Sequence, residues 1–146
     1  MSVLVIDASI TLSWLLPDEV SDLAIGVRDQ DLPKAEAAWV PAHWRLEVCN
    51  SLWMAERRKR LDAAGVTQAA DLFLKIPVAI DSDTNERAGR ETLALARQHG
   101  LSVYDAAYLE LVLRRGAALA SLDEALRLAA KKLGVSVLPK KLPEES

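Results

Sequence analysis

Short apolar runs alternate along this chain with longer segments of helical periodicity, and proline, glycine or aspartate stands at most of the joins. This alternation is typical of an α/β domain. Strands of a parallel sheet are covered on both faces, so they appear in sequence as nearly continuous apolar runs, and that is the pattern here. We predict a parallel sheet with strands at residues 3–6, 38–40, 77–80, 117–120 and 135–138.

Helical periodicity fills the segments between the predicted strands. We expect helices near residues 9–16, 20–28, 43–58, 67–74, 84–98, 102–115 and 123–132. A chain of 146 residues, 51% of them hydrophobic, has the length and the apolar content of one domain with one core. We assign residues 1–138 to that domain and 139–146 to a short polar tail that we expect to be poorly packed.

Composition and charge exclude several classes of protein. No apolar run approaches the roughly 18 residues that a membrane span needs, and Asp7 interrupts the first one, so we expect a cytoplasmic protein without membrane contact. The single cysteine, Cys49, cannot form an intramolecular disulfide, and its apolar surroundings suit a small core residue. The net charge of −3 argues against coating nucleic acid by charge alone. A basic run at residues 57–60 is either a local nucleic-acid contact or a complement to the dipole of the preceding helix.

Two acidic residues directly follow predicted strands. Asp7 comes after the first strand and Asp123 comes shortly after the fourth, and open α/β sheets place their ligand sites at the carboxyl ends of strands. Helix capping is the competing explanation at both places. Asp7 or Ser9 would cap the next helix, and Ser121 with Glu124 fits a capping box. Position alone leaves both explanations open.

Two more acidic residues lie inside predicted helices. Asp105 falls on the apolar face of its helix with Tyr108, where an ionised carboxylate needs a partner, a hydrogen bond or a cation. A capping box from Ser102 to Asp105 is the alternative. Glu47 borders the apolar stripe of residues 44, 48, 52 and 55, where a simple exposed position is the alternative.

Together these four carboxylates favour a site for a hard divalent cation. Carboxylates gathered at neighbouring strand ends repel one another unless cations are present, and Mg²⁺ or Mn²⁺ prefers oxygen ligands. Such ions can activate water for attack on a phosphodiester. Other schemes lack their motifs: the sequence has no glycine-rich phosphate loop and no nucleophile elbow, and His43 and His99 have no zinc-ligand spacing.

The chain resembles the PIN domains, and within them the VapC-type ribonuclease toxins of toxin-antitoxin pairs. The resemblance spans nearly the whole chain. The residues that carry it are Val5-Ile6-Asp7-Ala8-Ser9, Trp14-Leu15-Leu16-Pro17, Glu47-Val48 with Asn50-Ser51-Leu52, Gly100-Leu101-Ser102 with Tyr104-Asp105-Ala106, and Ser121 with Asp123. One departure is Ser121, where the family often has threonine, and this change keeps the hydroxyl.

This resemblance implies a three-layer α/β/α fold with strand order 3-2-1-4-5, which would bring Asp7 and Asp123 together. It also implies an endoribonuclease dependent on Mg²⁺ or Mn²⁺, a homodimer, and a cognate antitoxin whose segment covers the active-site groove. Asp7 and Asp105 match the usual metal ligands, and Glu47 and Asp123 match the acids that complete the cluster. We expect Ser9, Asn50 and Ser121 to support these acids.

Two other functions remain open at the level of sequence. One is a phosphatase that uses Asp7 as nucleophile, although Ser9 stands where the second acid of such enzymes would be. The other is a non-catalytic module with a PIN-like fold that binds RNA or protein.

Overall fold

The structure of this protein, a computed structural model, describes residues 2–142. Its strands form one parallel sheet in the order β3-β2-β1-β4-β5, as the resemblance implied. The strands are β1 (Val3–Ile6), β2 (Ala37–Val40), β3 (Ala79–Ile80), β4 (Ala118–Ala120) and β5 (Val137–Leu138). Each overlaps a predicted apolar run. The sheet order makes β1 and β4 neighbours although more than 100 residues separate them, and Val5 pairs with Leu119 across this junction.

Helices connect the strands, and within residues 2–142 every α-helix except the short one at Leu32–Lys34 overlaps a segment that helical periodicity predicted. They are α1 (Ala8–Leu15), α2 (Asp22–Gly26), α3 (Leu32–Lys34), α4 (Trp44–Arg57), α5 (Ala63–Phe73), α6 (Thr84–Arg87), α7 (Leu93–His99), α8 (Val103–Arg115) and α9 (Glu124–Lys132). Two predicted helices are divided: π-helical turns at Val27–Asp31 and Ala88–Thr92 follow α2 and α6. Within residues 2–142 no helix is long and apolar enough to cross a membrane.

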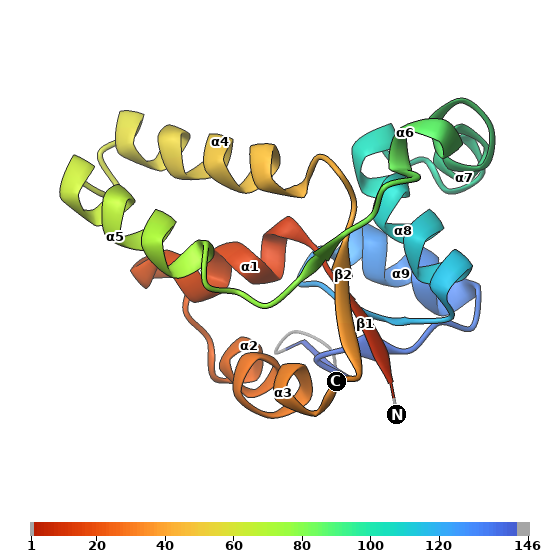
Figure 1. The fold of residues 1–146 in the computed structure, drawn as a ribbon, viewed down its shortest axis with the longest axis horizontal. Coiled ribbons are helices and arrows are strands. Elements are labelled where there is room, and N and C mark those ends of the chain that lie inside the picture. Colours follow the sequence, from red (N-terminus) through yellow and green to blue (C-terminus); the bar gives the residue numbers. More distant parts are fainter. Residues whose placement is uncertain (1, 143–146) are drawn as a thin grey trace.

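The helices cover both faces of the sheet and so form three layers (Figure 1). Helices α1, α4 and α5 lie on one side of the strands, and α8 and α9 lie on the other. Between these layers the side chains of residues 4–6 of β1 and 119–120 of β4 are buried. The paired helices α4 and α5 extend away from the sheet, where Trp44 packs on Phe73 with ring centroids 4.7 Å apart. Helices α6, α7 and α8 form a second group, which lies on the other side of the strands from this helix pair.

The packing of α4 contradicts the expectation for Cys49, which is exposed. The helix packs on α1 and α5 through a single stripe, Trp44, Val48, Leu52 and Ala55, which is the stripe that the sequence predicted. Cys49 follows Val48 by one residue, about 100° further around the helix, and so it faces away from that stripe.

The last described residues are better packed than we expected for a polar tail. Leu142 is buried, and the carbonyl of Lys140 accepts a hydrogen bond from the buried Arg127 guanidinium at 3.4 Å. The rest of the predicted tail, residues 143–146, lies outside the described residues.

One member of the basic run at residues 57–60 has a structural partner. Arg60 donates to Asp18 at 2.8 and 2.9 Å and to Glu19 at 2.6 Å, which ties the turn between α4 and α5 to the segment after α1. Arg57 instead lies near the exposed ring of Trp53, 6.0 Å from its centroid. The charge of Arg60 is therefore paired with acids of this chain.

Candidate active site

Asp7 stands at the junction where β1 ends and α1 begins. Its carboxylate caps α1 by accepting a hydrogen bond from the Ile10 amide at 3.0 Å, and it also accepts from the hydroxyls of Ser9 (2.7 Å) and Ser121. Its own amide donates to the carbonyl of Ala120 at 3.0 Å. Asp7 is therefore a cap and also the point where the ends of β1 and β4 are joined.

The Asp7 carboxylate is almost completely buried, with only 4% of the residue exposed. Burial raises its pKa to about 6, although the hydrogen bonds from Ser121, Ile10 and Ser9 oppose this shift, and the charge of Asp123 adds to it. At neutral pH a buried carboxylate of this kind is stabilised by a nearby cation. The environment of Asp7 therefore fits a metal ligand better than a simple helix cap.

Asp123 lies beyond the end of β4 and caps α9, because its carboxylate accepts a hydrogen bond from the Leu126 amide at 2.9 Å. The predicted capping box of Ser121 with Glu124 is therefore wrong. Ser121 is buried and instead links the two strand ends: its hydroxyl donates to Asp7 and accepts from the Asp123 amide at 3.0 Å. Ser9 completes this link by accepting from the Leu122 amide at 2.9 Å.

Asp105 fits both explanations that the sequence left open, helix capping and a place in the acidic cluster. Ser102 caps α8 and its hydroxyl accepts a hydrogen bond from the Asp105 amide at 3.0 Å. Yet the half-buried Asp105 carboxyl has a raised pKa, first because of burial and second because of the charge of Asp123, which outweigh the opposing effects of Ser102 and His43. Asp105 therefore lies close enough to another acid of the site for the two charges to interact.

We predict that Asp105→Asn leaves the melting temperature of the metal-free protein unchanged or raises it, because the substitution removes a carboxylate that burial and Asp123 disfavour. The same substitution should abolish the stabilisation that Mn²⁺ gives to the wild-type protein, as ligand linkage requires. Differential scanning fluorimetry with EDTA and with Mn²⁺ measures both. A lower melting temperature with the Mn²⁺ effect intact would assign Asp105 to capping alone.

Glu47 projects from the first turn of α4 and meets α8. The buried Tyr108 donates its hydroxyl to Glu47 Oε1 at 2.7 Å, and His43 Nε2 lies 3.5 Å from the same oxygen. Burial, together with the charges of Glu47, Asp7 and Asp105, raises the pKa of Tyr108 far above its usual range, so the phenol stays a donor. Tyr108 thus has three of the four predicted acids in its electrostatic surroundings.

A surface cavity of about 500 Å³ lies beside Glu47 and Asp105. Its other lining residues are His43, Leu46, Asn50, Ser102 and Tyr104. Asn50 is exposed there and makes no side-chain hydrogen bond within residues 2–142, so the expectation that it supports Glu47 stays a prediction. The cavity gives Glu47 and Asp105 an opening toward solvent.

The donor set fits a hard cation, since all four predicted acids offer carboxylate oxygens. Within residues 2–142, however, no three acidic, histidine or cysteine side chains converge into a ready-made metal centre. Mg²⁺ does not require one, because it usually binds through one or two carboxylates and keeps several waters. Asp123 lies near enough to Asp7 and to Asp105 for its charge to raise the pKa of both, and these three acids would hold the ion with Glu47 beside them.

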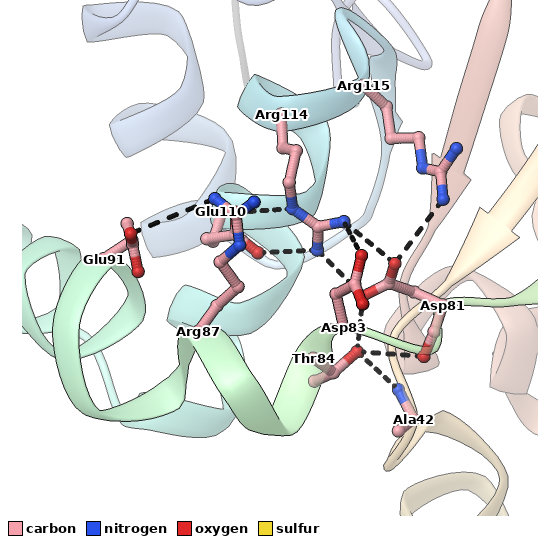
Figure 2. Close-up of polar contacts among 9 residues, drawn as sticks. All are labelled: Ala42, Asp81, Asp83, Thr84, Arg87, Glu91, Glu110, Arg114 and Arg115. Carbon is pink, nitrogen blue, oxygen red and sulfur yellow. Dashed lines mark hydrogen bonds and ion pairs between the residues drawn. The ribbon is translucent and has the colours of Figure 1, made fainter.

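The sequence analysis missed a second acidic group at the same edge of the sheet (Figure 2). Asp81 directly follows β3, and its fully buried carboxylate accepts two hydrogen bonds from Arg114 on α8, at 2.9 and 2.8 Å. Arg114 also makes two bonds to Glu110, which is buried. The position of Asp81 after a strand was the available signal. Because Arg114 neutralises it, Asp81 fixes α8 to the sheet.

The parallel order 3-2-1-4-5, with acids at the ends of its two central strands, is that of a three-layer α/β protein with its site at the switch point. The family model of the PIN domain matches residues 4–132, so this chain belongs to the PIN-domain family. Ribonuclease VapC3 of Pyrobaculum aerophilum is 29% identical over 136 residues, which cover 93% of this chain and 98% of that protein.

Solved structures share the fold. VapC20 of Mycobacterium tuberculosis, described as a sarcin-ricin loop cleaving toxin, is 17% identical with a TM-score of 0.63, over 96% of this chain and 99% of that one. VapBC2 of Rickettsia felis, solved with a DNA fragment from its promoter, is 10% identical with a TM-score of 0.62, over 92% of this chain and 96% of that one. The resemblance found in the sequence is confirmed at the level of family and fold.

Proposed function

We propose that this protein is an endoribonuclease that hydrolyses RNA with Mg²⁺ or Mn²⁺ and serves as the toxin of a toxin-antitoxin pair. The observation that carries the proposal is the buried Asp7 carboxylate at the end of β1, with its pKa raised to about 6 and Asp123 beyond the adjacent strand end. A cation offsets the energetic cost of this arrangement. Membership of the PIN-domain family and the similarity to ribonuclease VapC3 support the choice of chemistry.

We assign the following roles to residues of this chain. Asp7, Asp105 and Asp123, with Glu47, hold the ion, and the hydroxyls of Ser9 and Ser121 fix the orientation of Asp7. A bound Mg²⁺ or Mn²⁺ lowers the pKa of water and stabilises negative charge on the leaving oxygen. No side chain is needed as a nucleophile. The phosphatase alternative lacks its second acid, because Ser9 stands at that position and donates a hydrogen bond to Asp7 at 2.7 Å.

The cavity beside Glu47 and Asp105 supports single-stranded or looped RNA as the substrate. It offers the polar side chains of Asn50 and Ser102 and the ring of Tyr104, which is 68% exposed. Exposed aromatic rings stack on unpaired bases, and polar side chains reach base edges that a duplex would hide. Since the net charge is −3, binding depends on such local contacts more than on a general basic field.

The partners that we propose are an antitoxin and a second copy of this chain. VapC20 is described as a toxin, and the VapBC2 structure belongs to the same fold. In this protein Leu46, 77% exposed, borders the cavity, and an antitoxin segment that covers the cavity would bury it. Light scattering of the partner-free protein tests the homodimer, and copurification with the product of a neighbouring gene tests the antitoxin.

Cleavage of RNA by the purified, partner-free protein tests the proposed activity. Because the target sequence is unknown, total cellular RNA is incubated with the protein and the new 5′ ends are sequenced. We expect discrete cuts with Mg²⁺ or Mn²⁺, no cuts with EDTA, and recovery when excess metal is restored. Cutting that persists in EDTA would contradict the metal mechanism. Binding of RNA without any cut in the presence of metal would favour the non-catalytic module.

A further inference from the structure

The hydrogen bond between Tyr108 and Glu47 joins two parts of the proposed site that lie 61 residues apart in sequence. Tyr108 belongs to α8, one helical turn after Asp105, and its residue is 1% exposed. Glu47 belongs to α4, and 34% of its side chain is exposed. The phenolic oxygen of Tyr108 therefore lies at the boundary between the core and the cavity. There the hydroxyl of a buried ring contacts the partly exposed carboxylate of Glu47.

Hydrogen bonds from backbone amides at a helix N-terminus restrain the carboxylates of two of the other acids. Asp7 accepts from the Ile10 amide, and Asp123 accepts from the Leu126 amide. Glu47 has no such contact. Its backbone amide donates within its own helix, and its carboxylate has partners only in Tyr108 and His43 among the described residues.

Both partners of Glu47 approach the same oxygen. Tyr108 donates to Oε1 at 2.7 Å, and His43 Nε2 lies 3.5 Å from Oε1, while Oε2 has no hydrogen bond or ion pair within residues 2–142. A glutamate side chain samples many rotamers unless a contact selects one, and selecting one costs conformational entropy. The hydrogen bond from Tyr108 selects one rotamer of Glu47, and the Tyr108 ring is itself fixed by the core. This bond leaves the second carboxylate oxygen of Glu47 for another ligand.

We propose that Tyr108 is a positioning residue that holds Glu47 toward the cation site and so sets the affinity of the protein for its divalent metal. The proposal rests on the proposed metal-dependent function. Tyr108 acts through Glu47: the phenol keeps Oε1 in place, Oε2 stays available, and α8 thereby fixes the separation between Glu47 and Asp105. Groups that orient a metal ligand commonly change metal affinity by about 10–100-fold when they are removed.

Tyr108→Phe tests this role because it keeps the buried ring and removes only the hydroxyl. We expect the half-saturating Mn²⁺ concentration, measured by thermal shift in the absence of RNA, to rise about tenfold. The Mn²⁺ concentration for half-maximal RNA cleavage should rise with it. Ser13→Ala is the matched control, since Ser13 is a buried hydroxyl that donates one hydrogen bond, to the Ile10 carbonyl at 2.6 Å. It should leave the Mn²⁺ requirement unchanged.

A double-mutant cycle tests whether Tyr108 acts through Glu47. Glu47→Gln alone should weaken Mn²⁺ binding, and the addition of Tyr108→Phe should weaken it by less than about twofold more, because coupled residues are not additive. A full tenfold loss in the Glu47→Gln background would overturn the proposal. So would a Tyr108→Phe variant that binds Mn²⁺ as tightly as the wild type.

A measurement on the wild-type fold does not depend on the stability of any Tyr108 variant. With ring-¹³C-labelled tyrosine, Tyr104→Phe assigns the two tyrosine resonances, and we expect the Tyr108 resonance to shift on saturation with Mg²⁺ in the wild type but not in Glu47→Gln. A Tyr108 resonance that does not shift when Mg²⁺ binds would overturn the proposal. If wild-type protein neither binds Mg²⁺ nor cleaves RNA, the proposed function itself fails, which is a distinguishable result.

Discussion

Asp7→Asn is expected to lower metal-dependent RNA cleavage by at least about a hundredfold, the scale for loss of one group that stabilises the transition state. Asp7 lies at the meeting point of β1 and β4, and its carboxylate is oriented by Ser9, Ile10 and Ser121. An amide keeps this shape but loses the negative charge that a divalent cation requires. The rate of cleavage of a mapped RNA site, at saturating Mn²⁺, measures the loss.

The same substitution should leave the metal-free melting temperature unchanged or raise it. Burial moves the pKa of Asp7 from 3.8 to about 6, so the folded state disfavours the ionised form by about 3 kcal/mol at most. A raised folded pKa means that metal-free stability falls as pH rises from about 4 to about 6. The asparagine side chain cannot ionise, so the variant should lose that part of the pH dependence. The amide offers only one acceptor oxygen, which offsets part of the gain.

Asp29→Asn is the matched control, because Asp29 is an exposed acid whose one ion-pair partner among residues 2–142 is Arg28, at 2.8 Å. It should change neither cleavage nor Mn²⁺ stabilisation. Undiminished cleavage by Asp7→Asn would remove Asp7 from the site. A loss of cleavage that came with a large fall in melting temperature would mean that Asp7 acts as a structural cap.

The sequence was sufficient to predict that Asp7 and Asp123 lie near the same edge of the sheet. Asp7 directly follows a buried strand and Asp123 comes shortly after another, and parallel strands end at one edge. The order that makes β1 and β4 neighbours came from the family resemblance, because apolar runs of similar composition do not specify their pairing. The structure also shows that capping and site membership are compatible, since Asp7 and Asp123 both cap helices.

Contacts between distant segments were beyond prediction from local pattern. The bond from Tyr108 to Glu47 depends on how α4 crosses α8, and helical periodicity fixes only which face each helix buries. Glu110 shows the same limit: it is buried, and its carboxylate is paired with Arg114, which also binds Asp81. Only the tertiary partner of each residue decides whether such a charge is solvated or paired.

Arg114→Met is expected to cause the largest loss of stability, because it leaves two buried carboxylates without their main partner. Arg114 makes paired hydrogen bonds to Asp81 and to Glu110, and only 15% of its side chain is exposed. Removal of one partner from a buried ion pair costs about 3–5 kcal/mol. For a domain of this size that is a fall of roughly 10–16 °C in melting temperature. Arg115, 3.5 Å from Asp81 Oδ1, limits the loss.

Arg60→Met is the control that separates burial from charge pairing. Arg60 also binds two carboxylates, those of Asp18 and Glu19, but both acids are exposed, with 54% and 38% of their side chains accessible. Exposed ion pairs contribute about 1 kcal/mol or less. Thermal unfolding of the two variants side by side should therefore show a clear difference, and equal melting temperatures would contradict the structural role of Arg114.

The pH dependence of unfolding gives a further test of the role of Arg114. In the wild type, Arg114 holds the pKa of Asp81 well below its usual range, so the stability from this pair is present above about pH 4 and is lost as pH falls. Without Arg114, the largest cause that lowers the pKa of this carboxyl is lost, while burial still acts to raise it. The Arg114→Met variant should therefore be destabilised most at neutral pH. The difference in stability between the variant and the wild type should become smaller as pH falls. A difference in stability that stays constant from about pH 7 down to about pH 2 would show that Arg114 contributes through packing and not through its charge.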